Sequence, residues 1–217
     1  MLAIGGYLFT RSENRAAQLV AEQRTQDEAL QAYLDHMGQM LLDKDMPLRQ
    51  SKEGDEVRTL ARARTLTMLA RLDGPRKGSV VQFLYESGLV NRDRTTPLDS
   101  LPIVNLKRAN LRGAILSKTN LELANLYRAD LSRAELQGAV LSQTSFYRAD
   151  LKGADLRGAD LRDAILYFAE LEGANLLAAK VTGGQLDEAR SLEGATMPNG
   201  QTYEEWVKSR EEGDSGS

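Results

Sequence analysis

The chain has 217 residues, a formal net charge of −3 and no cysteine. This length allows one or two domains. Without cysteine, the chain can form neither a disulfide framework nor a thiol-based catalytic site, which fits a reducing compartment. No run of 18 apolar residues is present, so no segment is long enough to span a membrane in full. We therefore expect a cytoplasmic protein, with the inner face of the membrane as an alternative location.

Residues 1–11 form an apolar N-terminal segment, in which most of Met1–Phe9 is apolar and Arg11 follows. It lacks the basic start and the cleavage site of a signal peptide. Two interpretations stay open. The segment is a frayed terminus or helix start, or it is the last part of a truncated membrane helix with Arg11, Arg15 and Arg24 on the cytoplasmic side.

Residues 12–98 indicate an α-helical domain. Ser12 is a plausible N-cap of the first helix and Asp55 of the second, because short polar side chains accept hydrogen bonds from free helix N–H groups. Asp73-Gly74-Pro75 breaks the pattern. The expected helices run from 12 to about 43, from 56 to about 72 and from about 77 to 88, with a loop at 47–54 and a polar linker at 92–99.

A leucine recurs every five residues from Leu106 to Leu186. Of these 17 frame positions, 15 are Leu, the exceptions being Phe146 and Val181, and the residue two places earlier is Ala in 13 cases. The stretch 149–158 shows the unit clearly as A-(D/N)-L-x-x. A fixed internal period indicates a repeat architecture.

A period of five fits neither regular element, because it spreads the leucines around a helix and alternates them across a strand. The chain must therefore bend once per repeat so that each Ala/Leu pair points inward. Glycine suits such corners because it tolerates positive φ. It occupies the second place after the frame residue at Gly113, Gly138, Gly153, Gly158, Gly173 and Gly183. The period thus predicts a coil with an apolar core.

This run resembles the pentapeptide-repeat family, which implies a right-handed quadrilateral parallel β-helix with four repeats per turn over residues 99–190. Thr119, Thr144 and Gly184 depart from the pattern by replacing the Ala. The preceding helical block also resembles segments found in some membrane-associated bacterial members. After Ala189 the five-residue period lapses. We expect a C-terminal cap at 191–208, with Trp206 covering the last coil, and a disordered tail at 209–217.

Three tyrosines are spaced by 20 residues, the spacing that four repeats per turn would stack on one side of a coil. With their neighbours they form the candidate binding face: Tyr127, Arg128, Tyr147, Arg148, Tyr167 and Phe168. Aromatic residues and arginine are favoured in protein interfaces. They also stack on nucleic-acid bases, and an aromatic ladder can simply stabilise a sheet. All three interpretations remain open at this stage.

Other patterns do not predict chemistry. Asp130, Asp150 and Glu170 share the 20-residue spacing and are expected to form a row of solvated carboxylates rather than a cation site. His36, the single histidine, lies in a helical segment, and a lone histidine without cysteines does not make a transition-metal site. The letters Gly-Asp-Ser-Gly at 213–216 lie in the tail, away from any scaffold for a triad. We therefore predict no catalytic residue, no cofactor and no metal.

The sequence thus favours a non-catalytic protein-interaction or scaffold module, with a protein partner of unknown identity and, in one variant, a membrane tether at the N-terminal segment. Nucleic acid is not an expected partner, and the oligomeric state is not predicted. The alternative is a gyrase-interacting protein that imitates DNA, as some pentapeptide-repeat proteins do. Such mimicry needs a strongly acidic rod, whereas residues 104–190 carry 12 Lys/Arg and 11 Asp/Glu.

Overall fold

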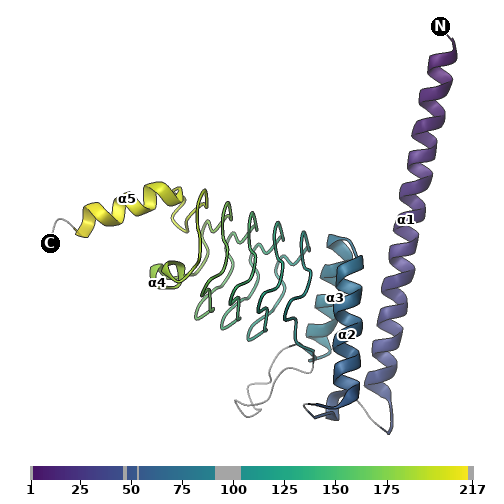
Figure 1. The fold of residues 1–217 in the computed structure, drawn as a ribbon, viewed down its shortest axis with the longest axis horizontal. Coiled ribbons are helices and arrows are strands. Elements are labelled where there is room, and N and C mark those ends of the chain that lie inside the picture. The colour runs from purple at the N-terminus through teal and green to yellow at the C-terminus, as the bar shows by residue number, and fades with distance from the viewer. Residues whose placement is uncertain (1, 46–47, 53, 91–103, 215–217) are drawn as a thin grey trace.

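The computed structural model describes the backbone of residues 2–45, 48–52, 54–90 and 104–214, and the side chains of these residues except 2–13 and 212–214. A set of N-terminal helices is followed by a coil of stacked turns and by two short helices at the far end (Figure 1). The elements are α1 (Leu2–Leu42), the 3₁₀ helix η1 (Leu48–Gln50), α2 (Glu56–Arg71), α3 (Gly74–Glu86), α4 (Gly183–Asp187) and α5 (Tyr203–Asp214).

Helix α1 is about 60 Å long at 1.5 Å per residue. It begins at Leu2, so Ser12 lies inside the helix, and its prediction as an N-cap was wrong. Tyr33 and Met37 are buried where its C-terminal half packs on α2 and α3, whereas the side chains of residues 14–25 are exposed and this part projects beyond the body (Figure 1). Within the described part of the chain, no helix is both long and apolar enough to cross a membrane.

Helices α2 and α3 are joined by the Asp73-Gly74-Pro75 motif. We expected the third helix to begin near Lys77, but it begins at Gly74, because Asp73 is its N-cap and accepts a hydrogen bond from the Arg76 N–H at 3.1 Å. Asp55 occupies the predicted N-cap position of α2, although its carboxylate accepts from the Lys52 N–H instead. The predicted loop at 47–54 contains η1, and the predicted linker at 92–99 lies outside the described residues.

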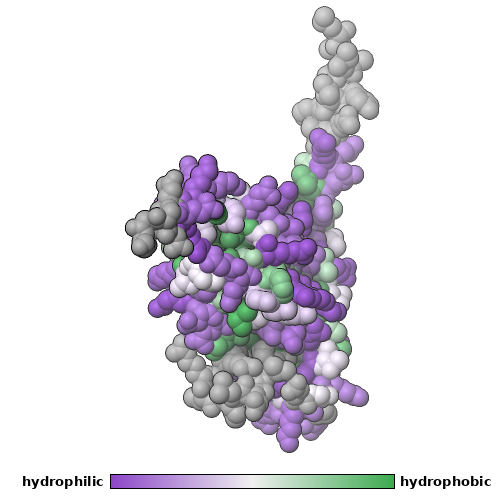
Figure 2. Space-filling model, turned by 60° about the vertical axis from the view of Figure 1, so that its left-hand side comes forward, coloured by the Kyte–Doolittle hydropathy of each residue, from purple (hydrophilic) through white to green (hydrophobic). Residues whose placement is uncertain are grey.

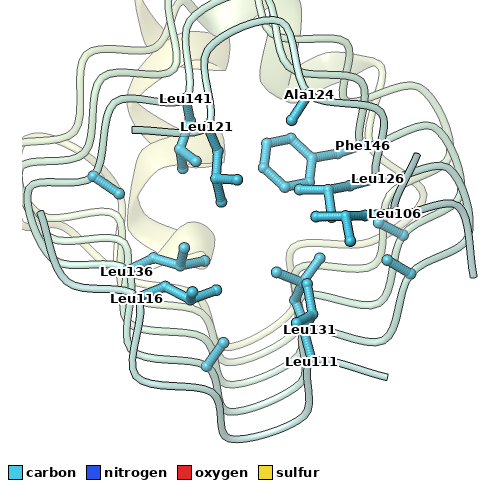
Figure 3. Close-up of a cluster of buried hydrophobic side chains, with 14 of the residues drawn as sticks. Leu106, Leu111, Leu116, Leu121, Ala124, Leu126, Leu131, Leu136, Leu141 and Phe146 are labelled. Carbon is cyan, nitrogen blue, oxygen red and sulfur yellow. The ribbon is translucent and has the colours of Figure 1, made fainter. Parts of the chain in front are cut away.

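The coil has four repeats per turn, as the family resemblance implies and in agreement with the tyrosine spacing. Parallel bridges join residues 20 apart, such as Asn110 with Asp130 and Asp130 with Asp150. The frame leucines point inward and form four stacks, one for each side of the coil (Figure 3). Phe146 continues the stack of Leu106 and Leu126 and is fully buried, so the exception in the leucine series fills the same core position.

Each corner of the coil places the second residue after the frame leucine in the left-handed region. Glycines such as Gly113 and Gly158 have φ of 62° and 65° there. Ten residues other than glycine adopt the same conformation, with φ between 54° and 62°. This region costs an L-residue roughly 1–2 kcal/mol, so the burial of the leucines holds these corners in place.

At the N-terminal end, α3 covers the open edge of the first turn. The Ile115 N–H donates to the Gly74 carbonyl at 3.1 Å, and the buried Lys77 ammonium donates to Asn110 Oδ1 and to the Arg112 carbonyl. The approach is close enough that a Cβ added to Gly78 would lie 2.2 Å from the Ile115 carbonyl oxygen. The helices therefore satisfy backbone groups that an uncovered sheet edge would expose.

At the C-terminal end, α4 interrupts the coil, so Leu186 lies in a helix and not in a regular coil unit. Gln185 Nε2 donates to the Leu161 and Ala164 carbonyls. The coil then resumes one residue out of register, with Glu170 bridged to Ser191. Leu192 lies six residues after Leu186, and Met197 lies five residues after Leu192. Both are buried in the resumed turn.

Helix α5 extends to Asp214. The prediction of a disordered tail was therefore wrong for residues 209–214, which are helical. Arg210 accounts for this extension. Its guanidinium lies over the Trp206 ring at 4.5 Å and forms two hydrogen bonds with the Asp187 carboxylate. Trp206 packs against the core cluster beside Tyr203, which is consistent with its expected role as a cover for the last turns.

We expect Gly78→Ala to lower the free energy of unfolding by about 2–3 kcal/mol, because the added methyl group overlaps backbone that cannot easily move. Gly38→Ala is the matched control. Gly38 lies inside α1 with no atom within 4 Å of the added Cβ, so this change should raise stability by about 0.5–1 kcal/mol. Urea unfolding of both variants measures the difference, and equal effects would contradict the close packing of α3 on the coil.

The corners predict a second pair of opposite effects. Gly158→Ala places a side chain at a φ of 65° in open space and should lower the free energy of unfolding by about 1 kcal/mol. Asp163→Gly removes the strain at an equivalent corner with a φ of 58° and should leave stability unchanged or raise it by up to about 1 kcal/mol. Thermal or urea unfolding decides the signs, and a destabilised Asp163→Gly variant would refute the strain assignment.

Candidate protein-interaction face

The three tyrosines of the candidate face form a continuous stack on the outside of the coil. The ring centroids of Tyr127 and Tyr147 lie 5.5 Å apart at an interplanar angle of 11°, and those of Tyr147 and Tyr167 lie 5.7 Å apart at 22°. Phe168 closes the stack, with its ring centroid 4.3 Å from that of Tyr167 and 6.2 Å from that of Tyr147. The structure thus brings together all four predicted aromatic residues. We call them, with Arg128 and Arg148, the ladder face.

The two arginines of the ladder face lie over its rings. The Arg128 guanidinium is 5.4 Å from the Tyr127 ring centroid, and the Arg148 guanidinium is 5.5 Å from the centroids of both Tyr147 and Phe168. Both arginines sit at corners with positive φ, which points their side chains outward. Neither forms an ion pair with a residue that the structure describes. Their guanidinium groups instead contact the rings of the ladder.

A shallow groove of about 640 Å³ runs beside the ladder. It is lined by Arg128, Arg148, Phe168, Glu170 and Arg190. The Glu170 carboxylate accepts from Arg190 at 3.1 Å and lies 2.7 Å from Lys152 Nζ, so its charge is already matched by these two cations. The hydrogen bond with the Glu170 carboxylate also raises the pKa of the Lys152 ammonium. The groove therefore presents an excess of positive charge.

Arg190 is the groove residue that the sequence interpretation missed. It lies 20 residues after Glu170, and its N–H donates to the Ala169 carbonyl at 2.8 Å. The 20-residue spacing of the acidic column therefore continues past α4, although the leucine period is interrupted there. Extending that spacing by one step would have placed Arg190 beside Glu170.

The predicted carboxylate row occupies the residue before each frame leucine. Asp130 and Asp150 each accept a hydrogen bond from the backbone N–H two residues later, at 3.0 Å. Asn and Asp side chains commonly hold turns in this way, which explains the D/N of the repeat unit. No group of three potential metal ligands occurs among the described residues. The hydrogen bonds of Asp130 and Asp150 give these two carboxylates a structural role at their turns.

Charges on two other sides of the coil are paired locally. Arg162 donates to the Asp160 carboxylate, and this interaction, as the largest of several causes, lowers the pKa of Asp160 to about 2. Arg157 holds the pKa of Asp155 below its ordinary value in the same manner. His36 is exposed on α1 and contacts the Ala32 carbonyl of the preceding turn. These residues stabilise local structure and do not converge on one site.

The surface seen in Figure 2 is mostly hydrophilic, and its hydrophobic residues form small separate patches. On the ladder face, the exposed fractions are 44% for Tyr167 and 41% for Phe168. Their ring centroids lie 4.3 Å apart and form an apolar strip, and Phe168 also lines the positively charged groove. Apolar and aromatic side chains beside arginine are the composition that protein interfaces favour.

The repeats match known proteins in sequence. The family model described as pentapeptide repeats matches residues 105–143 and 144–183, with eight copies. Rfr23, a pentapeptide repeat protein from the cyanobacterium Cyanothece 51142, is 33% identical over 52% of this chain and 78% of its own, with a TM-score of 0.24. The chain belongs to the pentapeptide-repeat family. This confirms the predicted fold class, a right-handed four-sided β-helix with an N-terminal helical region.

Two further solved structures are similar to this pentapeptide-repeat protein. The protein alr5209 from Nostoc PCC 7120 is 38% identical over 43% of this chain, with a TM-score of 0.33. A pentapeptide repeat protein from the Arabidopsis thaliana thylakoid lumen is 28% identical over 40% of this chain, with a TM-score of 0.28. The match spans 64% and 63% of the lengths of these two relatives. No curated protein is significantly similar to this chain.

The stacked rings predict unequal costs of truncation along the ladder. Tyr147 has a stacked ring on both sides, whereas Tyr127 has one. Aromatic pairs are worth about 0.5–1.5 kcal/mol beyond their area. We therefore expect Tyr147→Ala to lower the free energy of unfolding by about 1–2 kcal/mol and Tyr127→Ala by about half as much. Urea unfolding measures both values, and equal losses would show that the stack does not contribute through its ring pairs.

Proposed function

We propose that this protein is a non-catalytic interaction or scaffold module that presents the ladder face to a protein partner. The observation that supports this proposal most is the ladder itself. Tyr167 and Phe168 are large aromatic side chains, yet each is more than 40% exposed to solvent. The arginines over the rings form no ion pair with a described residue. Preorganised aromatic and arginine side chains lose little freedom on binding, which favours their use as interface anchors.

A non-catalytic role fits the construction of the face. It is an open outer surface whose described polar groups are guanidinium groups, tyrosine hydroxyls and one ion-paired glutamate. General acid–base or nucleophilic catalysis needs a nucleophile within hydrogen-bond reach of a base. The ladder face instead offers stacking and charge, which serve recognition.

The alternative of a DNA-mimicking gyrase partner is less well supported. A DNA mimic must present rows of negative charge, whereas the repeat region carries 12 basic and 11 acidic residues. Its acidic residues Asp155 and Asp160 are also paired with neighbouring arginines. A gyrase supercoiling assay with the purified chain tests this alternative, and inhibition or protection of gyrase would favour it over our proposal.

Affinity capture from the native host tests the proposed function. We expect Tyr147→Ala to reduce recovery of a specific partner about tenfold or more, because truncating an interface anchor typically costs roughly 2 kcal/mol. Leu177→Ala is the matched control. Leu177 is 43% exposed and also follows a frame leucine directly, but it lies on another side of the coil. Unchanged recovery with Tyr147→Ala would refute the ladder face as the binding site.

Capture should be run with and without detergent, since this also tests the location of the protein. We propose a cytoplasmic location, with attachment at the inner face of the membrane as the variant that the apolar N-terminal segment suggests. A partner and bait recovered from the soluble fraction without detergent would support the first. Recovery that requires detergent would support the second, whichever result the ladder variants give.

A further inference from the structure

We propose that the groove beside the ladder binds an acidic segment of the partner, one in which Asp or Glu carboxylates flank an aromatic or aliphatic side chain. This inference rests on the proposed function and names the chemistry of the partner. It is carried by the charge of the groove, by the way its arginines are held, and by the apolar strip next to it.

The groove lining carries three positive charges, from Arg128, Arg148 and Arg190, against the single negative charge of Glu170. Glu170 is shared between Arg190 and Lys152, and so it does not neutralise the two arginines of the ladder. Unmatched cations in a groove attract anions and reject like charges. An acidic ligand is therefore the electrostatic complement of this surface.

The arginines of the ladder are held for bidentate recognition. Arg148 lies 5.5 Å from the centroids of both Tyr147 and Phe168, so its guanidinium is positioned by rings from two successive turns of the coil. Contact with rings does not consume the N–H donors of a guanidinium, which remain available to a carboxylate. Arginine–carboxylate pairs with two parallel hydrogen bonds are among the strongest side-chain interactions.

The apolar part of the ligand is assigned to the strip of Tyr167 and Phe168. These two side chains are 44% and 41% exposed, their ring centroids lie 4.3 Å apart, and Phe168 lines the groove. A ligand that was only charged would leave this strip in water. A segment that combines carboxylates with an apolar side chain would cover both surfaces.

Nucleic acid is a poorer match to the same groove. A phosphate backbone binds along a continuous basic path. Here Glu170 forms part of the groove lining. The exposed Glu188 lies beside Phe168 on the next turn, because its backbone carbonyl accepts a hydrogen bond from the Phe168 N–H at 2.9 Å. A short acidic peptide can place its carboxylates at the arginines alone, whereas a nucleic-acid strand would bring a continuous row of phosphates against these carboxylates.

The positive φ at the corners allows the charge of an arginine to be removed by a substitution with glycine. Arg128, Arg148 and Arg133 have φ of 54°, 56° and 58°, respectively. Glycine adopts this conformation without strain, so replacing these arginines with glycine removes the charge without disturbing the coil. Arg133 is exposed, is not part of the groove lining and follows a frame leucine by the same two places, which makes Arg133→Gly the matched control.

The test is fluorescence anisotropy with the full chain and a labelled 12-residue peptide, in which each tryptophan is flanked by glutamates. We expect each of the single variants Arg128→Gly and Arg148→Gly to bind the peptide about tenfold more weakly, because each loses one charge-assisted interaction. Arg133→Gly should bind like the unchanged protein. A peptide with glutamine in place of glutamate should bind at least tenfold more weakly, and higher salt should weaken binding of the acidic peptide.

Three results would overturn the inference: equal binding of the glutamine peptide, equal weakening by Arg133→Gly, or tighter binding of a 15-residue oligothymidine than of the acidic peptide. The capture experiment separates this inference from the proposed function. If Tyr147→Ala abolishes partner recovery while the acidic peptide does not bind, the ladder face is an interface for a partner of other chemistry. If neither effect is seen, the proposed function fails as well.

Discussion

The return of a leucine to the core every five residues is the constraint on which the rest of this structure depends. Each return requires a corner, and each corner places one residue at a φ between 54° and 65° in the regular turns. Where that residue is not glycine, the strain is of order 1 kcal/mol, which is smaller than the 1.5–3 kcal/mol gained by burying one leucine. The core therefore dictates the corners. The corners in turn fix the 20-residue register in which Tyr127, Tyr147 and Tyr167 stack.

A coil built in this way has two open ends, and the chain closes them by different means. At the first turn, α3 approaches so closely that Gly74 and Gly78 have no room for a Cβ. At the last turn, the Gln185 amide of α4 donates to the Leu161 and Ala164 carbonyls, and Arg210 connects α5 to Asp187. Covered edges prevent addition of another chain by strand pairing. The proposed interaction face therefore lies among the outward side chains of the coil and not at its edges.

The features of the fold and of the candidate face that follow from periodicity could be predicted from the sequence. The leucine frame predicted the coil, the family resemblance implied four repeats per turn, and the tyrosine spacing agreed with that number and predicted the members of the ladder. Features that depend on contacts between distant segments were missed. The start of α1 and the helical residues 209–214, held by Arg210 and Asp187, belong to this class. The one-residue shift after α4 hid the continuation of the coil, because Leu192 and Met197 no longer fit the period.

The distinction between a stabilising ladder and a binding face depends on what the corner positions require. Strain alone does not mark the ladder face, because non-glycine residues occupy corners with positive φ elsewhere on the coil, Arg133 and Asp163 among them. Stacking of the tyrosines alone would also be explained by stability. At Arg128 and Arg148 the guanidinium groups lie over the rings of the ladder, a contact worth about 0.5–1 kcal/mol at exposed sites that glycine would not provide. Stability and binding therefore make different predictions only for the ligand: the proposed acidic segment would use the N–H donors of these guanidinium groups, whereas a purely stabilising ladder would leave them to water.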